Sequence, residues 1–218
     1  MTAQFNPAYI GLRKDILSLI SGRPRTVLDV GCAAGALGGY LSARFGSRVF
    51  WVEYSPEMAE SARAKLEAVW CGDLNTRTLK SFPHEVRYDL IVCGDVLEHL
   101  VDPWGALREM TDLLEDGGSL VVSLPNIGHY TTLMSLFWRR KWPYRSRGIH
   151  DRTHLRFFTR RNLLELYAQA GLVPVREKRQ LRFWESGSPI DRAAVLLDFF
   201  PFRSFLTFQY LHVLRKKG

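Results

Sequence analysis

The clearest chemical signal in the sequence is a glycine-rich turn that ends a short apolar run. The turn, Asp29-Val-Gly-Cys-Ala-Ala-Gly35, closes a run that begins at Thr26. Glycines between a strand and a helix let a ligand approach the backbone closely. The dinucleotide fingerprint GxGxxG is absent. The acidic Asp29 before the turn would also repel the negative charge of a pyrophosphate. The turn therefore predicts a ligand site, and its details disfavour a dinucleotide.

Further polar residues follow the next apolar runs. Glu53 stands 22 residues after Gly31, where a carboxylate can accept hydrogen bonds from both hydroxyls of a ribose. Asp73 follows a short third run and can accept from an exocyclic amine, while Gly94 and Asp95 follow a fourth. In open α/β sheets, ligands bind beyond the carboxyl ends of the strands. We therefore expect these residues to face one nucleoside-like ligand.

The elements that must position these residues alternate along the chain. We expect strands over 26–30, 48–53, 68–71, 88–93 and 119–124, and helices over 35–44, 56–67 and 103–114. This alternation predicts a parallel α/β sheet with right-handed crossovers. A helix over 161–170, a strand over 172–183, a short helix over 191–200 and a strand over 204–215 complete the chain. We expect a single domain over 1–218, with 125–160 as an insertion over the active face.

The ordered motifs together resemble the class I S-adenosylmethionine-dependent methyltransferases, over about residues 8–183. The resemblance implies a Rossmann-like, seven-stranded, mostly parallel sheet with helices on both faces and an antiparallel last strand. It also implies S-adenosyl-L-methionine as cofactor and S-adenosyl-L-homocysteine as product. The one departure from the family pattern is Ala33, where a second glycine is usual; the change adds only a methyl group.

The resemblance assigns a role to each part of the cofactor site. Asp29, Gly31 and Gly35 would surround the methionine part, Glu53 would hold the ribose hydroxyls, and Gly94 and Asp95 would flank the sulfonium. The adenine would pack on Met58 and would bond Asp73 and the Leu74 backbone. The full set of expected cofactor residues is Asp29, Gly31, Cys32, Ala33, Gly35, Glu53, Tyr54, Met58, Asp73, Leu74, Gly94 and Asp95.

Two later segments suggest the acceptor. Residues 124–130 and 148–159 resemble a bacterial branch that includes methionine-biosynthesis protein W and ubiquinone-biosynthesis O-methyltransferases, a branch often associated with cell-surface polysaccharide pathways. We therefore expect O-methylation of a sugar, a glycan precursor or another small acceptor. A non-catalytic, regulatory partner of another biosynthetic enzyme is the alternative.

Deprotonation of a hydroxyl near neutral pH commonly uses a histidine. His129 and His154 are the candidates, and the alternative is that each ring orients a backbone loop. The side chains of His150, Asp151 and His154 are also of the ligand type. No further ligand accompanies this motif at a suggestive spacing, so we expect no metal.

Charge and composition narrow the partners further. The net charge of +8 is concentrated in residues 139–161, which carry nine Lys and Arg against Asp151 alone. Such a patch suits an anionic small or lipid-linked acceptor, or an anionic membrane surface, and no nucleic-acid module accompanies it. Residues 131–144 are either a lid or membrane-surface element, or a helix packed on the core. Three scattered cysteines without a signal peptide or a long apolar span predict a cytoplasmic protein, with the inner membrane face as an alternative location.

Overall fold

The computed structural model describes residues 11–63, 68–82, 87–184 and 188–218, and its centre is one seven-stranded sheet. The strands lie in the order β3-β2-β1-β4-β5-β7-β6. Their bounds are β1 Thr26–Val30, β2 Arg48–Glu53, β3 Ala68–Cys71, β4 Tyr88–Gly94, β5 Leu114–Pro125, β6 Leu172–Leu181 and β7 Thr207–Lys216.

Five strands are parallel neighbours, and β7 alone runs against the others because it pairs antiparallel with both β5 and β6. This confirms the predicted mostly parallel sheet with an antiparallel last strand. The amino-terminal end of β7 consequently lies at the edge where the parallel strands end.

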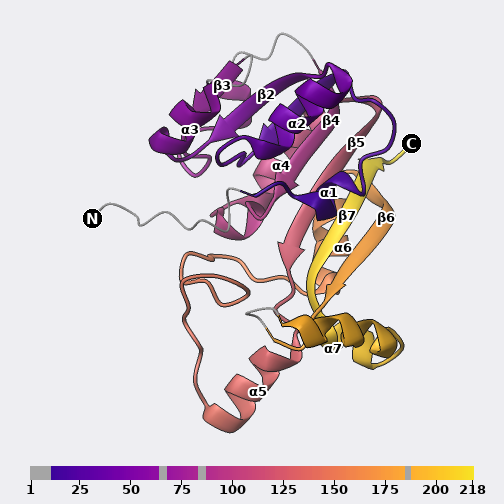
Figure 1. Cartoon of the computed structure of the whole chain (residues 1–218). Helices are drawn as coiled ribbons and strands as arrows, with labels where there is room; N and C mark the ends of the chain where they lie inside the picture. Colours follow the sequence, from indigo (N-terminus) through magenta and orange to yellow (C-terminus); the bar gives the residue numbers. More distant parts are fainter. Residues whose placement is uncertain (1–10, 64–67, 83–86, 185–187) are drawn as a thin grey trace.

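Helices cover both faces of the sheet (Figure 1). Their bounds are α1 Lys14–Leu17, α2 Ala36–Phe45, α3 Pro56–Arg63, α4 Pro103–Leu113, α5 Tyr130–Arg139, α6 Arg160–Gln169 and α7 Phe202–Leu206, with 3-10 helices η2 Leu79–Ser81, η3 Leu97–His99 and η4 Pro189–Leu197. Successive side chains of β1 point to opposite faces of the sheet, so the hydrophobic core has two parts. Leu28 packs with side chains of α4 and α6 on one face, and Val27 packs with side chains of α1 and α2 on the other.

Several predicted bounds shift. The helix expected over 56–67 is described from Pro56 to Arg63, and 64–67 lie outside the described residues. The strand expected at 119 begins at Leu114, because an irregularity in its pairing with β4 accommodates the residues between Leu114 and Ser119. The helix expected over 191–200 is instead the 3-10 helix η4, followed by α7.

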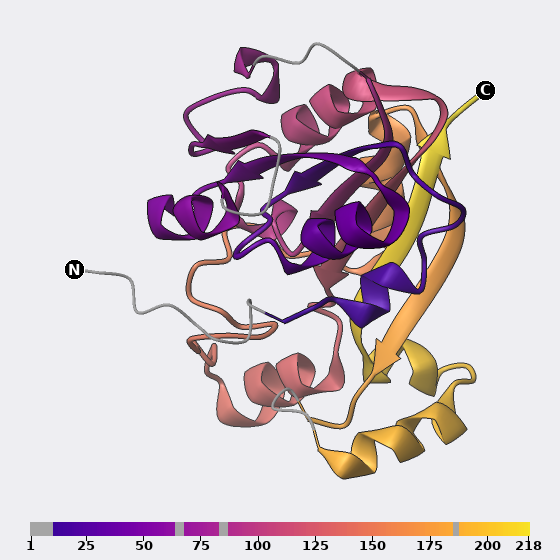
Figure 2. The same ribbon diagram turned by 45° about the horizontal axis from the view of Figure 1, so that its top comes forward.

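The segment after β5 contains α5, whose apolar side chains are largely exposed. Its buried residues are the polar Thr132 and Ser135, whereas Phe137 and Trp138 are exposed. In two views α5, η4 and α7 lie at the end of the sheet toward which the parallel strands point (Figures 1 and 2). No described helix combines the length and the apolar character that crossing a membrane requires.

Candidate active site

The glycine-rich turn between β1 and α2 has a backbone that only small residues can follow. Gly35 has φ +79°, and a Cβ atom there would lie 2.5 Å from the Trp51 ring. Gly31 also has a positive φ, and its Cβ would overlap with the Val96 side chain. Ala33 adopts φ +48° in the left-handed region, where glycine is usual. The turn therefore keeps its shape despite the alanine.

Glu53, at the end of β2, stabilises this turn through hydrogen bonds to backbone N–H groups. Its Oε2 atom accepts a hydrogen bond from the Ala33 backbone N–H at 2.8 Å, and its Oε1 accepts from the Ser55 N–H at 2.8 Å. The residue is buried. Each carboxylate oxygen can accept more than one hydrogen bond, so Glu53 retains capacity for a ligand hydroxyl.

A cavity of about 480 Å³ opens beside the turn, at the carboxyl ends of β1 and β4. From the predicted cofactor set, its walls include Asp29, Gly31, Cys32, Ala33, Gly94 and Asp95. Burial, together with the nearby charge of Glu53, raises the pKa of Asp29 to about 7. Burial likewise raises the pKa of Cys32, so its thiol is protonated at neutral pH.

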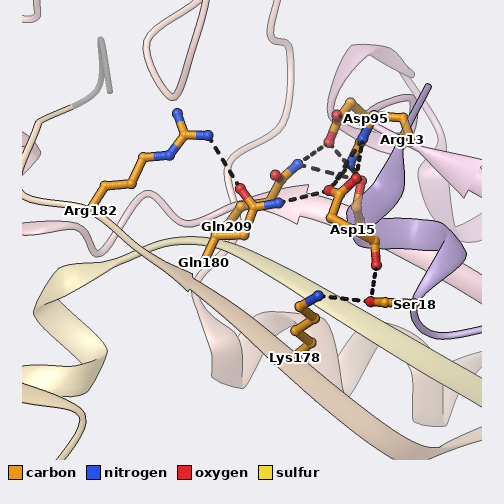
Figure 3. A network of polar contacts seen from close by, with 9 residues as sticks. Arg13, Asp15, Ser18, Asp95, Lys178, Gln180, Arg182 and Gln209 are labelled. Carbon is orange, nitrogen blue, oxygen red and sulfur yellow. Dashed lines mark hydrogen bonds and ion pairs between the residues drawn. The ribbon is translucent and has the colours of Figure 1, made fainter. Parts of the chain in front are cut away.

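Polar side chains from other segments also line the cavity, and Figure 3 shows the contacts among them; we call them the polar wall. Arg13 Nη1 donates to Asp95 Oδ2 at 2.6 Å, and Ser123 Oγ donates to Asp95 Oδ1 at 2.9 Å. Gln209 Nε2, from the amino-terminal end of β7, donates to the same Asp95 oxygen. The aspartate has φ +59°. These bonds hold Asp95 in its left-handed conformation at the end of β4.

The network continues from Arg13 to β6. Two guanidinium nitrogens of Arg13 donate to the carboxylate of Asp15, which also accepts from Gln180 Nε2 at 2.7 Å. Burial opposes protonation of Arg13, but Asp95 and Asp15 outweigh it, so the pKa of Arg13 is raised. Arg182 lies near the end of this chain of contacts, over the Phe208 ring at 4.3 Å, and its Nη2 donates to Gln180 Oε1 at 3.4 Å.

The remaining predicted cofactor residues lie beside β2 and β3, outside the lining of this cavity. Tyr54 is 72% exposed, and Met58 and Leu74 are half-buried. Asp73 is half-buried, and its Oδ1 accepts from the Asn75 N–H at 2.8 Å in a local turn. The parallel pairing of β2 with β1 and β3 still ends all three strands at one edge, which places these residues alongside Glu53.

Both ring nitrogens of His129, predicted as a candidate base, have hydrogen-bond partners within the protein. It caps α5, where Nδ1 accepts from the Thr131 N–H at 3.4 Å and lies 2.8 Å from the Thr131 hydroxyl. Its Nε2 lies 2.9 Å from the Arg182 carbonyl oxygen, to which it donates in the matching tautomer. The ring is fully buried. These contacts correspond to the loop-orienting alternative considered from the sequence.

His154, the other candidate base, is nearly buried and lies beside η3. Its Nδ1 lies 3.1 Å from the Ile149 carbonyl oxygen, and its Nε2 is 4.0 Å from Glu98 Oε1. Burial, followed by the neighbouring His99, lowers the pKa of His154 to about 4. The ring is therefore neutral at neutral pH and is a weak base.

His150 and Asp151, considered with His154 as ligand-type residues, contact other side chains and backbone groups. His150 Nε2 lies 3.0 Å from the Thr132 hydroxyl, and Asp151 Oδ1 accepts from the Thr153 N–H at 2.9 Å.

Apart from Asp95, the residues of the polar wall were not predicted from the sequence. Arg13 and Asp15 lie in a short amino-terminal stretch without a recognisable motif, Gln180 lies in a mixed polar strand, and Arg182 follows the end of that strand. A usable signal existed for Ser123 and Gln209, since each is a polar residue inside an apolar strand near the ligand-binding edge.

Comparison with known families gives one extensive match. The family model described as "Methyltransferase domain" matches residues 5–177. Among similar proteins, the "Ubiquinone biosynthesis O-methyltransferase" of Xanthomonas campestris pv. campestris (strain B100) is 34% identical over 103 residues, which cover 46% of this chain and 43% of the relative. The protein of that name from Xanthomonas euvesicatoria pv. vesicatoria is 32% identical over 124 residues, 56% of this chain and 50% of the relative. The match to these relatives thus spans about half of their length.

Solved structures share the fold at low sequence identity. A SAM-dependent methyltransferase from Archaeoglobus fulgidus aligns with TM-score 0.64 and 19% identity, over 94% of this chain and 90% of that one. The 1,6-didemethyltoxoflavin-N1-methyltransferase of Burkholderia thailandensis, solved with S-adenosylhomocysteine, aligns with TM-score 0.60 and 20% identity over 94% and 78%.

Proposed function

This chain belongs to the family of S-adenosylmethionine-dependent methyltransferases, and from this premise we propose that it methylates a hydroxyl of a sugar, a glycan precursor or another small acceptor. The observation that carries the proposal is the cavity beside the glycine-rich turn, whose polar wall includes Gln180, Arg182 and Gln209 beside Asp95. Amide and guanidinium groups suit an acceptor with several oxygen atoms. The relatives named O-methyltransferases support oxygen as the acceptor atom.

The cofactor would lie along the edge formed by β4, β1, β2 and β3. In this proposal its methionine part contacts Asp29, Gly31, Cys32, Ala33 and Gly35, and its sulfonium faces Gly94 and Asp95. The ribose hydroxyls would donate hydrogen bonds to the carboxylate of Glu53, near Tyr54. The adenine would lie against Met58, Asp73 and Leu74. The support is the common strand edge and the tie from Glu53 to the turn.

Methyl transfer would be an in-line displacement whose rate depends on alignment. Holding the acceptor oxygen about 3–3.5 Å from the methyl carbon supplies much of the acceleration. In this proposal the hydrogen bonds to Asp95 hold the polar wall next to the sulfonium in place, and this wall would position the acceptor. We propose that His129 maintains the α5 end of this wall through the Arg182 carbonyl rather than serving as the base.

Residues 125–160 would form the acceptor side of the site and would meet a membrane surface. The support is a set of exposed apolar side chains on α5 and in residues 184 and 188–205, together with the basic residues of 139–147, which begin at the end of α5. That set comprises Leu133, Met134, Leu136, Phe137, Trp138, Trp184, Ile190, Val195, Leu196, Phe199, Phe200, Phe202 and Phe205, and the exposed Tyr144 lies among the basic residues. Aromatic groups beside cationic ones suit the interface of an anionic bilayer. An anionic, lipid-linked acceptor would be delivered there.

The cofactor part is tested by calorimetric titration with S-adenosylhomocysteine. Glu53→Ala should weaken binding at least tenfold, whereas the exposed Glu57→Ala on α3 should leave it unchanged. Transfer of a labelled methyl group is then measured with nucleotide sugars, hexuronates and phenols, with and without vesicles containing phosphatidylglycerol. Absence of binding to the unaltered protein refutes the proposal. Binding without transfer to any hydroxyl favours the regulatory alternative.

A further inference from the structure

Two arginines line the cavity, and they differ in their acidic partners. Arg13 forms ion pairs with Asp15 at 2.8 Å and with Asp95 at 2.6 Å. Arg182 forms no ion pair with the residues that the structure describes, and its guanidinium donates one hydrogen bond, to Gln180 Oε1 at 3.4 Å. A guanidinium has several N–H donors, so most of those of Arg182 have no partner in the described part of the chain.

The positive charge of Arg182 is only partly balanced by its surroundings. Burial lowers the pKa of Arg182, and the more distant charges of Asp191 and Asp15 oppose this effect only in part. In Arg13, by contrast, adjacent carboxylates outweigh burial and the pKa is raised. Asp191 already accepts a hydrogen bond from the Phe183 N–H at 2.7 Å. A half-buried charge without a close partner is costly, and an anion bound beside Arg182 would remove this cost.

The backbone around Arg182 is held by the segments that follow β5 and β6. The Arg182 N–H donates to the Leu206 carbonyl oxygen of α7 at 2.9 Å, and the Arg182 carbonyl oxygen lies 2.9 Å from His129 Nε2 at the start of α5. The next carbonyl oxygen, that of Phe183, accepts from the hydroxyl of Tyr130. These contacts come from the proposed acceptor side of the cavity and not from the glycine-rich turn, so Arg182 is placed to recognise the acceptor.

Two glutamines connect Arg182 to the end of β4. Gln180 on β6 is the pairing partner of Gln209 on β7, and Figure 3 shows both side chains between Arg182 and Asp95. An ionised carboxylate only accepts hydrogen bonds, so the amide nitrogen of Gln209 faces Asp95 and its Oε1 atom points elsewhere. Oε1 accepts no hydrogen bond from the described residues, and it can accept one from a hydroxyl of the acceptor.

We propose that Arg182 selects an acceptor with an oxyanion group, a carboxylate or a phosphate monoester, and that the hydroxyl to be methylated donates to Gln209 Oε1. The guanidinium fork matches the oxygen atoms of either anion. This inference rests on the proposed function, in which the sulfonium faces Asp95, the hydrogen-bond partner of Gln209. The hydroxyl would then lie near the methyl donor, and the anion would lie farther along the polar wall. A neutral analogue would leave the charge of Arg182 without a partner and should bind more weakly.

The preference for an anion is measured by calorimetric titration of the protein saturated with S-adenosylhomocysteine. One set of probes is 4-nitrophenyl β-D-glucoside, the corresponding glucuronide and the glucoside 6-phosphate. The other set is 3,4-dihydroxybenzamide and 3,4-dihydroxybenzoate. We expect a charged probe of at least one set to bind about tenfold or more tightly than its neutral analogue, as a charged hydrogen bond predicts. Comparison of the glucuronide with the 6-phosphate then identifies the anion as a carboxylate or a phosphate.

Variants at Arg182 test whether this residue causes the preference. Arg182→Gln should weaken binding of the charged probes about tenfold or more and should leave the neutral probes within about threefold. Arg182→Lys should keep part of the preference, because the charge remains while the planar fork is lost. Arg176→Gln, at an exposed position of β6, is the matched control and should bind every probe as the unaltered protein does. Affinity for S-adenosylhomocysteine should stay within about twofold in all three variants.

Three results would overturn this inference. The first is that no charged probe binds to the unaltered protein more tightly than its neutral analogue, a result that does not depend on the folding of any variant. The second is an unchanged preference in folded Arg182→Gln or an undiminished one in Arg182→Lys. The third is a loss of S-adenosylhomocysteine affinity in these variants with the preference intact, which would assign Arg182 to the cofactor. Absence of S-adenosylhomocysteine binding by the unaltered protein refutes the proposed function instead, and titration of the same probes without cofactor still tests Arg182.

Discussion

The buried carboxylate of Asp29 should make cofactor binding depend on pH. Its pKa of about 7 in the cofactor-free protein means that it is half protonated at neutral pH. The methionine part of the cofactor carries an ammonium group, which would favour the carboxylate form of Asp29 and lower its pKa. Binding must therefore release a proton, and affinity must rise as the pH rises through 7.

The size of this effect follows from linkage. If only the carboxylate form binds, the apparent dissociation constant is multiplied by a factor of about 11 at pH 6 and about 2 at pH 7. S-adenosylhomocysteine should therefore bind about fivefold more tightly at pH 7 than at pH 6. The ligand ammonium stays protonated across this window, since α-amino groups titrate near pH 8. At pH 7 about half a proton should be released for each ligand bound.

Calorimetric titration in two buffers with different ionisation enthalpies measures both the affinity and the proton release. Asp29→Asn should lose the pH dependence and should bind about 10–100-fold more weakly at pH 7, as expected for loss of a charged hydrogen bond. Asp73→Asn is the matched control, because it should weaken binding yet keep the fivefold change. Equal affinity at pH 6 and pH 7, or proton uptake on binding, would refute the assignment of Asp29 to the ammonium.

Three further predictions concern stability and are measured by denaturant unfolding. Gly35→Ala should cost about 2–4 kcal/mol, because it combines a left-handed backbone with overlap against Trp51. Gly39→Ala, with no atom near its Cβ, should be neutral or gain up to about 1 kcal/mol, and equal effects at the two sites would contradict the turn geometry. Glu177 has a pKa lowered to about 2, chiefly by the hydrogen bond from His212, so it stabilises the fold above pH 4.5. Up to about 3 kcal/mol should be lost as the pH falls from 4.5 to 2, and a Glu177→Gln variant that still shows this loss would assign it elsewhere. His129→Ala should cost about 1–3 kcal/mol while leaving S-adenosylhomocysteine affinity within twofold, and a large loss of affinity with unchanged stability would contradict its capping role.

The cofactor half of the molecule could be predicted because its signals are local. The strands over 26–30 and 48–53 have the predicted bounds, since each is a short buried run that ends at a turn. The turn residues Gly31 and Gly35 are explained by positive φ and close contacts, which sequence alone can indicate through glycine. Parallel pairing then brings the strand ends to one edge without further information.

The polar wall of the cavity, apart from Asp95, could not be predicted because its contacts join distant segments. Arg13 reaches Asp95 and Ser123, which are 82 and 110 residues away, and Asp15 accepts from Gln180, which is 165 residues away. No local pattern signals such pairs. The segment expected to be a helix over 191–200 is the 3-10 helix η4. Its cap, Ser188, is a signal in the local sequence, whereas its packing beside β6 is a tertiary contact that no local pattern predicts.

The antiparallel β7 explains why these distant residues meet at the cavity. Because β7 enters the sheet between β5 and β6, its first residues lie at the edge where the parallel strands end, and Gln209 stands next to Ser123 and Asp95. A parallel seventh strand in the same place would have put Gln209 at the opposite edge. β6 runs in the direction of β5, so its carboxyl end brings Gln180, and Arg182 just beyond the strand, to the same edge. The cavity is thus lined by the ends of β1 and β4, and its polar wall joins Asp95 to residues 13, 15, 180, 182 and 209 from distant parts of the sequence.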